Sequence, residues 1–215
     1  TNIMKQKLLL AITMIAFLTT SAQITLLKEI NNSGTSSSSP ENLFVFNNKI
    51  YFAADDSNGS NTPGGADLGK ELWITDGTTN GTTFVKDIRS GNANSSIQNF
   101  FIFNSKLYFT AFSTASELWT SDGTEVGTTL ADLMPSITGE SPQRFLELNG
   151  LAYFTVGGQP GSGAETTNKL VEWNGTDSAV QVADVGDGYE IILSDMIALD
   201  NKILIYMSYS TTITS

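Results

Sequence analysis

Apolar residues along this chain fall into short runs that come in pairs. Each run is rich in β-branched and aromatic residues, and the two runs of a pair are separated by Asn-Asn, Asn-Ser, Asn-Gly or Asp-Asn. These dipeptides tolerate the positive φ angles of a two-residue hairpin turn. The sequence therefore predicts four β-hairpins, over residues 43–52, 100–109, 146–154 and 197–205.

A second pattern follows the hairpins. Residues 71–78 read Glu-Leu-Trp-Ile-Thr-Asp-Gly-Thr and return at 117–124 as Glu-Leu-Trp-Thr-Ser-Asp-Gly-Thr. A second Gly-Thr and another β-rich run come next in both copies, and a degraded copy of the motif lies at 171–176. Each unit thus contains a hairpin of strands A and B, a strand C that carries Trp, a glycine-containing turn and a strand D.

The spacing of the units indicates the fold class. Trp73 and Trp119 are about 46 residues apart, whereas an insertion around 157–167 separates Trp119 further from Trp173. Four strands in about 46 residues is the size of one blade of a β-propeller. We expect an all-β chain of tandem four-stranded antiparallel meanders, forming a partial β-propeller of about 3.5 blades that is truncated at the C-terminus. Consecutive β-sandwich units built from the same meanders are the alternative.

The segment before the first hairpin resembles the D strands, with Ile24-Thr25-Leu26-Leu27-Lys28-Glu29-Ile30. We therefore expect it to be an outer strand that completes a blade begun elsewhere, because ring closure removes exposed sheet edges. Further C-terminal repeats of the same chain are the expected partners. The predicted division is a signal peptide over 1–22, the outer strand over 23–30, repeats over 31–88, 89–133 and 134–185, and the start of a fourth repeat over 186–215.

The N-terminal residues are typical of an export signal. Lys5 and Lys7 precede an apolar run over 8–18, and small polar residues lead to Ala22, where we expect cleavage. A run of this length is too short for a membrane span, which needs about 20 residues, so no transmembrane segment is predicted. The expected location is extracellular or on the cell surface.

Composition excludes several kinds of chemistry. The sequence has no Cys and no His, which excludes disulfides, thiol nucleophiles and any Ser-His-Asp arrangement. Asp and Glu number 22 against 11 Lys and Arg, and the basic residues are scattered, so nucleic acid is not an expected partner. No catalytic and no cofactor-binding residue is assigned from the sequence.

The pattern Glu-Leu-Trp-x-x-Asp-Gly-Thr-x-x-Gly-Thr, complete at 71–82 and 117–128, resembles the ELWxxDGT repeat family of exported bacterial proteins. The third copy retains Trp173, Gly175 and Thr176 of the motif. The resemblance covers residues 24 to about 207. It implies a bacterial secreted or surface repeat protein whose activity is generally undefined.

The repeated residues have structural explanations. We expect Trp73, Trp119 and Trp173 to pack between neighbouring sheets, and Asp76 and Asp122 to fix turns through hydrogen bonds to the backbone. The series formed by the tyrosines at 51, 108 and 153 fits the same interpretation.

Recognition is instead expected where the copies differ, in the B–C and D–A connections, which share one end of a meander. The first B–C loop, over 53–69, holds about a dozen extra residues. Its Asp55, Asp56 and Asn58 are weak candidates for calcium ligands, and a plain solvated loop is the favoured interpretation. No other cofactor is expected.

These observations favour a non-catalytic binding or adhesion module that recognises an extracellular glycan or protein through its variable loops. A polysaccharide-active enzyme is the alternative, because a glycosidase or lyase on a propeller scaffold needs only carboxylates. A purely structural spacer is the third interpretation.

Overall fold

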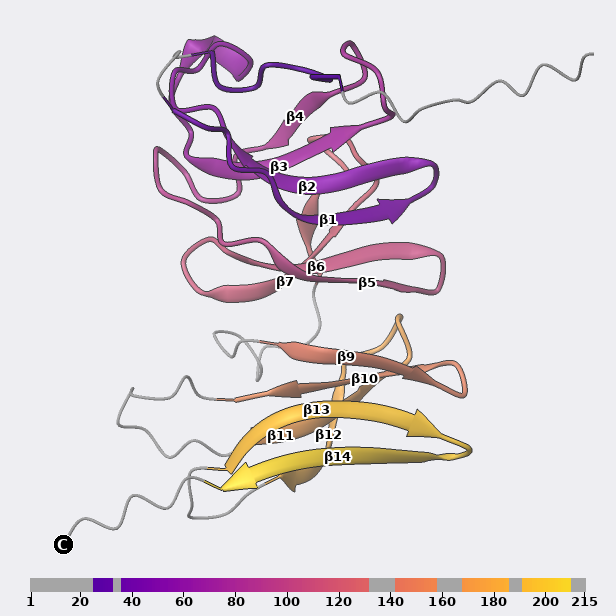
Figure 1. The fold of residues 1–215 in the computed structure, drawn as a ribbon. Coiled ribbons are helices and arrows are strands. Elements are labelled where there is room, and N and C mark those ends of the chain that lie inside the picture. The colour runs from indigo at the N-terminus through magenta and orange to yellow at the C-terminus, as the bar shows by residue number, and fades with distance from the viewer. Residues whose placement is uncertain (1–24, 33–35, 132–141, 158–167, 186–190, 210–215) are drawn as a thin grey trace, which may run out of the picture.

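The computed structural model describes residues 25–32, 36–131, 142–157, 168–185 and 191–209 (Figure 1). Unit 1 is a sheet of β1 (Glu41–Phe46), β2 (Lys49–Asp55), β3 (Lys70–Thr75) and β4 (Thr83–Lys86). Unit 2 is a sheet of β5 (Gln98–Phe103), β6 (Lys106–Phe112), β7 (Ser116–Ser121) and β8 (Thr129–Leu130). Unit 3 is a sheet of β9 (Gln143–Leu148), β10 (Leu151–Val156), β11 (Asn168–Trp173) and β12 (Val180–Val185). Unit 4 is the hairpin of β13 (Ile191–Leu199) and β14 (Lys202–Tyr209).

Each of the three larger sheets is an antiparallel meander, with its strands hydrogen-bonded in chain order. This confirms the predicted four-strand unit, and all four predicted hairpins are present. The A–B turns have the expected left-handed backbone: φ is 49° at Asn47 and 57° at Asn48, and 48° at Asn104 and 60° at Ser105. Asparagine pays less for this conformation than most residues, which explains its recurrence at the turns.

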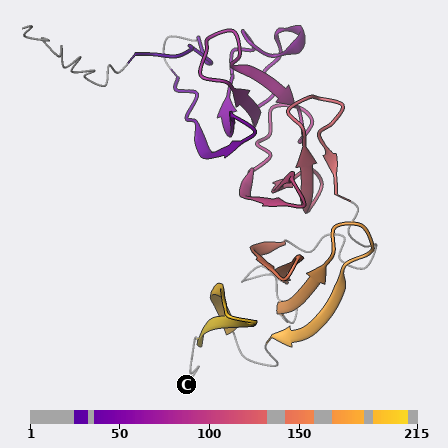
Figure 2. The ribbon, with the colours of Figure 1, turned by 90° about the vertical axis from the view of Figure 1, so that its right-hand side faces the viewer.

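The sheets follow one another along the chain with their first strands adjacent. β1 contacts β5, β5 contacts β9, and β9 contacts β13. In the turned view of Figure 2, the sheets lie along a curved path rather than in one flat row. The described part of the chain is therefore an all-β array of repeated sheets.

Alternating side chains of the central strands bury both faces of a sheet. In β2, Tyr51 packs in a cluster shared with unit 2, whereas the next residue, Phe52, packs on the opposite face. The same alternation places Phe109 of β6 against unit 1 and Tyr108 against unit 3. Period-2 alternation with both faces apolar is what a sheet between two other sheets requires.

Trp119 and Trp173 pack in interfaces between sheets, as predicted. Trp119 belongs to the core between units 1 and 2, and Trp173 belongs to the core between units 2 and 3. Trp73 is fully buried on the other face of unit 1, against Phe52 and Ile30. All three therefore lie on the face that points to the preceding position in the array.

Residues 25–30 form no strand in the described structure, and the outer strand over 23–30, whose expected partners are further repeats of the chain, stays a prediction. A strand needs a hydrogen-bonded neighbour, and no strand pairs with this segment. The predicted signal peptide lies outside the described residues, as do most of the third D–A connection and most of the insertion around 157–167. Within the described residues, no helix is long and apolar enough to cross a membrane. The helical element of the described residues is the short 3₁₀ turn η1 (Pro63–Gly65).

Candidate functional site at the loop end of the first sheet

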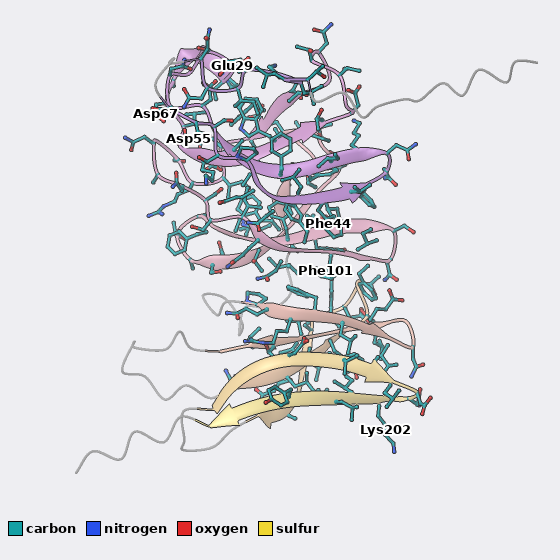
Figure 3. All side chains as sticks on the ribbon, in the orientation of Figure 1. Glu29, Phe44, Asp55, Asp67, Phe101 and Lys202 are labelled. Atoms are coloured by element: carbon teal, nitrogen blue, oxygen red, sulfur yellow. The ribbon has the colours of Figure 1, made fainter. Side chains whose placement is uncertain are left out.

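Every sheet has a turn end and a loop end. The turn end carries the A–B and C–D turns, and the loop end carries the B–C and D–A connections. Figure 3 shows the difference: Lys202, beside an A–B turn, projects on one side of the array, whereas Asp55 and Asp67 lie on the other side, near Glu29. The motif residues of the turns and the variable residues of the connections therefore lie at opposite ends of the sheets and are described in turn.

At the turn end, the Asp-Gly-Thr motif forms one hydrogen-bond network. Asp76 Oδ1 accepts bonds from the Thr78 backbone N–H (2.9 Å) and hydroxyl (2.7 Å). Thr78 in turn accepts a bond at its hydroxyl from Gly81 N–H (2.9 Å), and its carbonyl accepts one from the Thr82 hydroxyl (2.7 Å). The hydroxyls of Thr75 and Thr82 are 2.6 Å apart and buried. The polar groups of the motif therefore bond to one another and stabilise the C–D turn that contains them.

Unit 2 repeats this network at equivalent positions. Asp122 Oδ1 accepts from the backbone and hydroxyl of Thr124 at 2.8 and 2.7 Å, and the Ser121 and Thr128 hydroxyls are 2.7 Å apart. In unit 3, Asn174 Oδ1 takes the place of the aspartate and accepts from Thr176 N–H at 2.9 Å. The predicted role of Asp76 and Asp122 in fixing turns is confirmed. Hydrogen bonds from the threonine hydroxyl and backbone lower the pKa of both carboxyls.

At the loop end of unit 1, residues 56–69 form an ordered polar loop. Its backbone is closed by bonds from Gly59 N–H to the Asp56 carbonyl (2.8 Å) and from Gly65 N–H to the Thr62 carbonyl (3.2 Å). Side chains at 57, 58, 60 and 63–67 are exposed. The following D–A connection is tied to the same place, because Lys70 N–H donates to Asn94 Oδ1 and Ser95 N–H donates to the Lys70 carbonyl.

The structure gives the three calcium candidates different surroundings, and the buried Oδ1 atoms of Asp55 and Asp56 have no hydrogen-bond partner among the described residues. Asn58 is exposed, and its Oδ1 accepts bonds from the Ser60 backbone and hydroxyl. Asp56 is fully buried, and its Oδ2 accepts from Asn61 N–H. Asp55 is half-buried, and burial first, then the charge of Asp67, raises the pKa of its carboxyl. Across the residues that the structure describes, no group of three or more carboxylates could hold a metal ion.

The long loop instead holds the N-terminal segment. Asn61 Nδ2 donates to the carbonyls of Ile30 (2.7 Å) and Glu29 (3.3 Å). Asn31, itself buried, donates from Nδ2 to the Ser57 hydroxyl at 2.8 Å. Asn61 and Ser57 of this loop thus anchor the N-terminal segment, a role that the polar composition of the loop did not indicate.

The segment also occupies the place of a D strand, although it forms none. Ile30 corresponds to Ile88, and each packs beside the sheet that follows it, Ile30 on unit 1 and Ile88 between units 1 and 2. Lys28 corresponds to Lys86: Lys28 Nζ donates to the Thr82 carbonyl in the C–D turn of unit 1, and Lys86 Nζ donates to the Glu125 carbonyl in that of unit 2. The sequence resemblance to D strands therefore predicts the position correctly.

Glu71 is the most perturbed acid of the described residues. It is fully buried, its Oε2 accepts from Ile88 N–H (2.8 Å), and its Oε1 has no hydrogen-bond partner. Burial is the main cause that raises the pKa of Glu71 to about 8, and the charge of Asp87 adds to it. The motif position was treated as structural from the sequence, and nothing in the pattern indicated that one copy of this glutamate would be buried and protonated.

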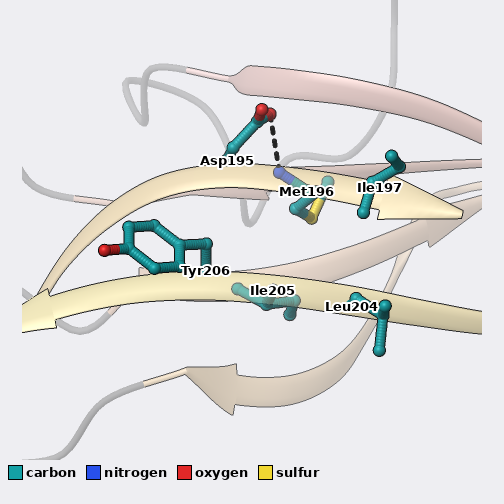
Figure 4. Close-up of a pocket in the computed structure, with 6 residues that line it drawn as sticks. All are labelled: Asp195, Met196, Ile197, Leu204, Ile205 and Tyr206. Atoms are coloured by element: carbon teal, nitrogen blue, oxygen red, sulfur yellow. Dashed lines mark hydrogen bonds between the residues drawn. The ribbon is translucent and has the colours of Figure 1, made fainter.

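A shallow depression of about 390 Å³ lies on the hairpin of unit 4 and is lined by Asp195, Met196, Ile197, Leu204, Ile205 and Tyr206 (Figure 4). It is open to solvent, and its single hydrogen bond among these residues joins Met196 N–H to Asp195 Oδ1. It is a sheet face rather than an enclosed ligand pocket. No protein-family model matches the chain, and no curated protein matches it either.

Proposed function

We propose that this chain is a non-catalytic binding module of an exported, propeller-like repeat protein, as its resemblance to the ELWxxDGT repeats implies, and that it recognises an extracellular glycan through the loop end. The observation that carries the proposal is the 56–69 loop, which combines an internally bonded backbone with exposed polar side chains on a rigid sheet. Ordered loops on a rigid scaffold are the usual place for recognition.

The turn end supports this assignment by elimination. Its carboxylates and hydroxyls are bonded to one another in the same way in units 1 and 2. A single binding site does not need the same residues in every unit, whereas a turn that stabilises each unit does. Recognition therefore belongs to the residues that differ between units.

The propeller arrangement is part of the proposal. Adjacent first strands and a curved succession of sheets support it, because the innermost strands of a propeller lie around its axis. A row of separate sandwiches would instead pair each sheet with one neighbour. Here the sheets of units 1 and 3 both pack against unit 2, on its opposite faces.

The enzyme alternative finds no support at Glu71. A carboxyl with a raised pKa beside Asp87 has the character of a general acid. However, Glu71 is fully buried, and its Oε2 is bonded to the backbone of the same unit. A polysaccharide in solvent has no access to the Glu71 carboxyl.

The proposal is tested by probing a glycan array, in the presence and in the absence of calcium, with a form of the chain that starts at Gln23. The key variant is Asn58→Ala with Asp67→Ala, which removes exposed polar groups of the loop but keeps Asn61 and its bonds to the N-terminal segment. The matched control is Glu125→Ala, an exposed acid at the turn end. We expect binding that the loop variant weakens at least tenfold and the control leaves unchanged. A negative array with a cooperative thermal transition would contradict glycan recognition and favour a protein ligand or a spacer.

A further inference from the structure

The two ends of the array expose matching apolar surfaces. One contact recurs between the first strands of consecutive units. It joins the residue three positions before the A–B turn in one unit to the residue four positions before the A–B turn in the next unit along the chain. Phe44 of unit 1 stacks on Phe100 of unit 2, with ring centroids 5.6 Å apart. Phe101 of unit 2 stacks on Phe145 of unit 3 at 3.9 Å.

The third junction has the same form with aliphatic residues. Leu146 of unit 3 packs in one cluster with Met196 of unit 4. One contact between first strands is thus formed three times within the chain. It always joins the same two positions of consecutive units.

Among the described residues, each end of the array carries one half of this contact without the other half. Leu43 of unit 1 is equivalent to Phe100 and Phe145, and it is 63% exposed. Ile197 of unit 4 is equivalent to Phe44 and Phe101, and it is 61% exposed. Val45 is exposed beside Leu43, and Leu199, Leu204 and Tyr206 are exposed beside Ile197, on the same face of the hairpin according to the strand register. Clustered exposed apolar residues mark interaction surfaces.

The C–D turns give independent support. A Cβ on Gly123 would meet Ile74 and Tyr51 of unit 1, and a Cβ on Gly175 would meet Asn104 and Phe103 of unit 2. Gly77 has the same φ of +88° as Gly123, but no atom of the described residues lies within 4 Å of its Cβ position. The space that the preceding unit fills at Gly123 and Gly175 is therefore open at Gly77.

Charge agrees with the same pairing. The pKa of Asp122 is lowered mainly by hydrogen bonds from Thr124 and further by Lys49 of the preceding unit, and Lys49 also lowers the pKa of Asp76 in its own unit. Lys202 is the equivalent of Lys49, and Asp76 is the equivalent of Asp122. Packing unit 4 of one copy against unit 1 of another would place Lys202 beside Asp76.

We propose that these surfaces are the two halves of one interface, and that two copies of this chain associate head to tail, with the β13–β14 hairpin of each copy docked on β1 and the 25–32 segment of the other. The exposed Leu26 of that segment, equivalent to Phe84, adds apolar surface at this junction. Two copies supply eight consecutive positions, within the range of about four to eight blades over which propellers close. This goes beyond glycan recognition, because it uses the ends of the array and not its loops.

Sedimentation velocity and light scattering on the chain produced from Gln23 test this pairing, at about 1–100 µM. We expect a dimer. Leu43→Glu alone and Ile197→Lys alone each give a monomer, and the double variant dimerises again because the new charges attract across the junction. Val126→Glu is the matched control, since Val126 is 88% exposed but lies at a C–D turn, and it remains dimeric.

All substituted side chains are exposed, so thermal melting should report folded protein in each case. A monomeric unsubstituted chain over this range would overturn the proposal. So would a dimer that Ile197→Lys disrupts and Leu43→Glu does not, because that result indicates hairpin against hairpin. The glycan array is read separately with the monomeric variants, so failure of one proposal is distinguishable from failure of the other.

Discussion

Units 1 and 2 have the same motif but different neighbours. At the turn end, their hydrogen bonds agree at each equivalent position, from Asp76 and Asp122 to the paired hydroxyls. At the loop end they differ: Glu71 is buried and bonded to Ile88 N–H, whereas Glu117 Oε2 accepts from the Ser113 hydroxyl. The comparison teaches that local turn chemistry is repeated with the motif, while the burial of the motif glutamate depends on its tertiary neighbours, which for Glu71 include Ile88 after β4.

The largest expected difference between the units concerns the turn glycines. Gly77→Ala should cost about 1–2 kcal/mol, the penalty for a positive φ without glycine. Gly123→Ala should cost about 3–4 kcal/mol, because its Cβ would also lie 2.6 Å from Ile74 Cδ1 and 2.9 Å from the Tyr51 hydroxyl. Urea unfolding of both variants measures the difference. Equal losses would mean that units 1 and 2 are not packed together in solution.

The second difference is a pH dependence specific to unit 1. The pKa of Glu71 is raised from 4.5 to about 8, so the folded state holds a proton that the unfolded state releases. Its contribution to stability is complete below about pH 4.5 and is lost as the pH rises through about 8. Glu71→Gln keeps an acceptor for Ile88 N–H without the charge, and it should melt several degrees higher than the unsubstituted chain at pH 9.

Glu117→Gln is the control for this pH dependence, because Glu117 is only half-buried. Differential scanning calorimetry between pH 5 and 9 gives both profiles. Parallel profiles for the Glu71 variant and the unsubstituted chain would show that Glu71 is ionised in the folded protein.

The paired hydroxyls should behave alike in both units. Thr82→Val and Thr128→Val each remove one member of a buried pair and leave the hydroxyl of Thr75 or Ser121 with one partner fewer. Each should lower the free energy of unfolding by about 1–2 kcal/mol. A loss confined to one unit in chemical denaturation would contradict the equivalence of the two turns.

The smallest effect is expected at the turn aspartates. Asn174 already makes the equivalent bonds in unit 3, so Asp76→Asn and Asp122→Asn should hardly change the melting temperature at pH 7. Because the pKa of each carboxyl is lowered in the fold, each contributes stability above about pH 3.8 that is lost as the pH falls. Melting curves at pH 3 and pH 7 should therefore converge in the double variant, and unchanged acid sensitivity would exclude these groups as its source.

The sequence predicts the features that depend on neighbours along the chain. Asn47 and Asn48 set the hairpin by their own backbone preference, and Asp76 bonds to a residue two positions away. Features that depend on tertiary neighbours were missed or stay predictions. Asn61 reaches Ile30 across 31 residues, and residues 25–30 lie in the place of a D strand without forming one, because strand pairing is decided by the partner.

The calcium candidates lie in the loop that we propose for recognition, and their role as ligands stays a prediction. Asp55, Asp56 and Asn58 read as possible calcium ligands because of their oxygen atoms and the glycine among them. In the fold, Asp56 and Asn58 bond to the loop itself. Spacing alone cannot distinguish a loop whose oxygens are free from one whose oxygens close its own backbone.

The central claim is that consecutive first strands lie side by side along the inner edge of the array. Nuclear Overhauser effects between Phe101 and Phe145 test it most directly, in a sample labelled on phenylalanine rings, with Phe101→Leu to assign the signal. The account predicts a strong cross-peak, because the two ring centroids are 3.9 Å apart although the residues belong to different units. A well-dispersed spectrum of a folded chain without that cross-peak would contradict it.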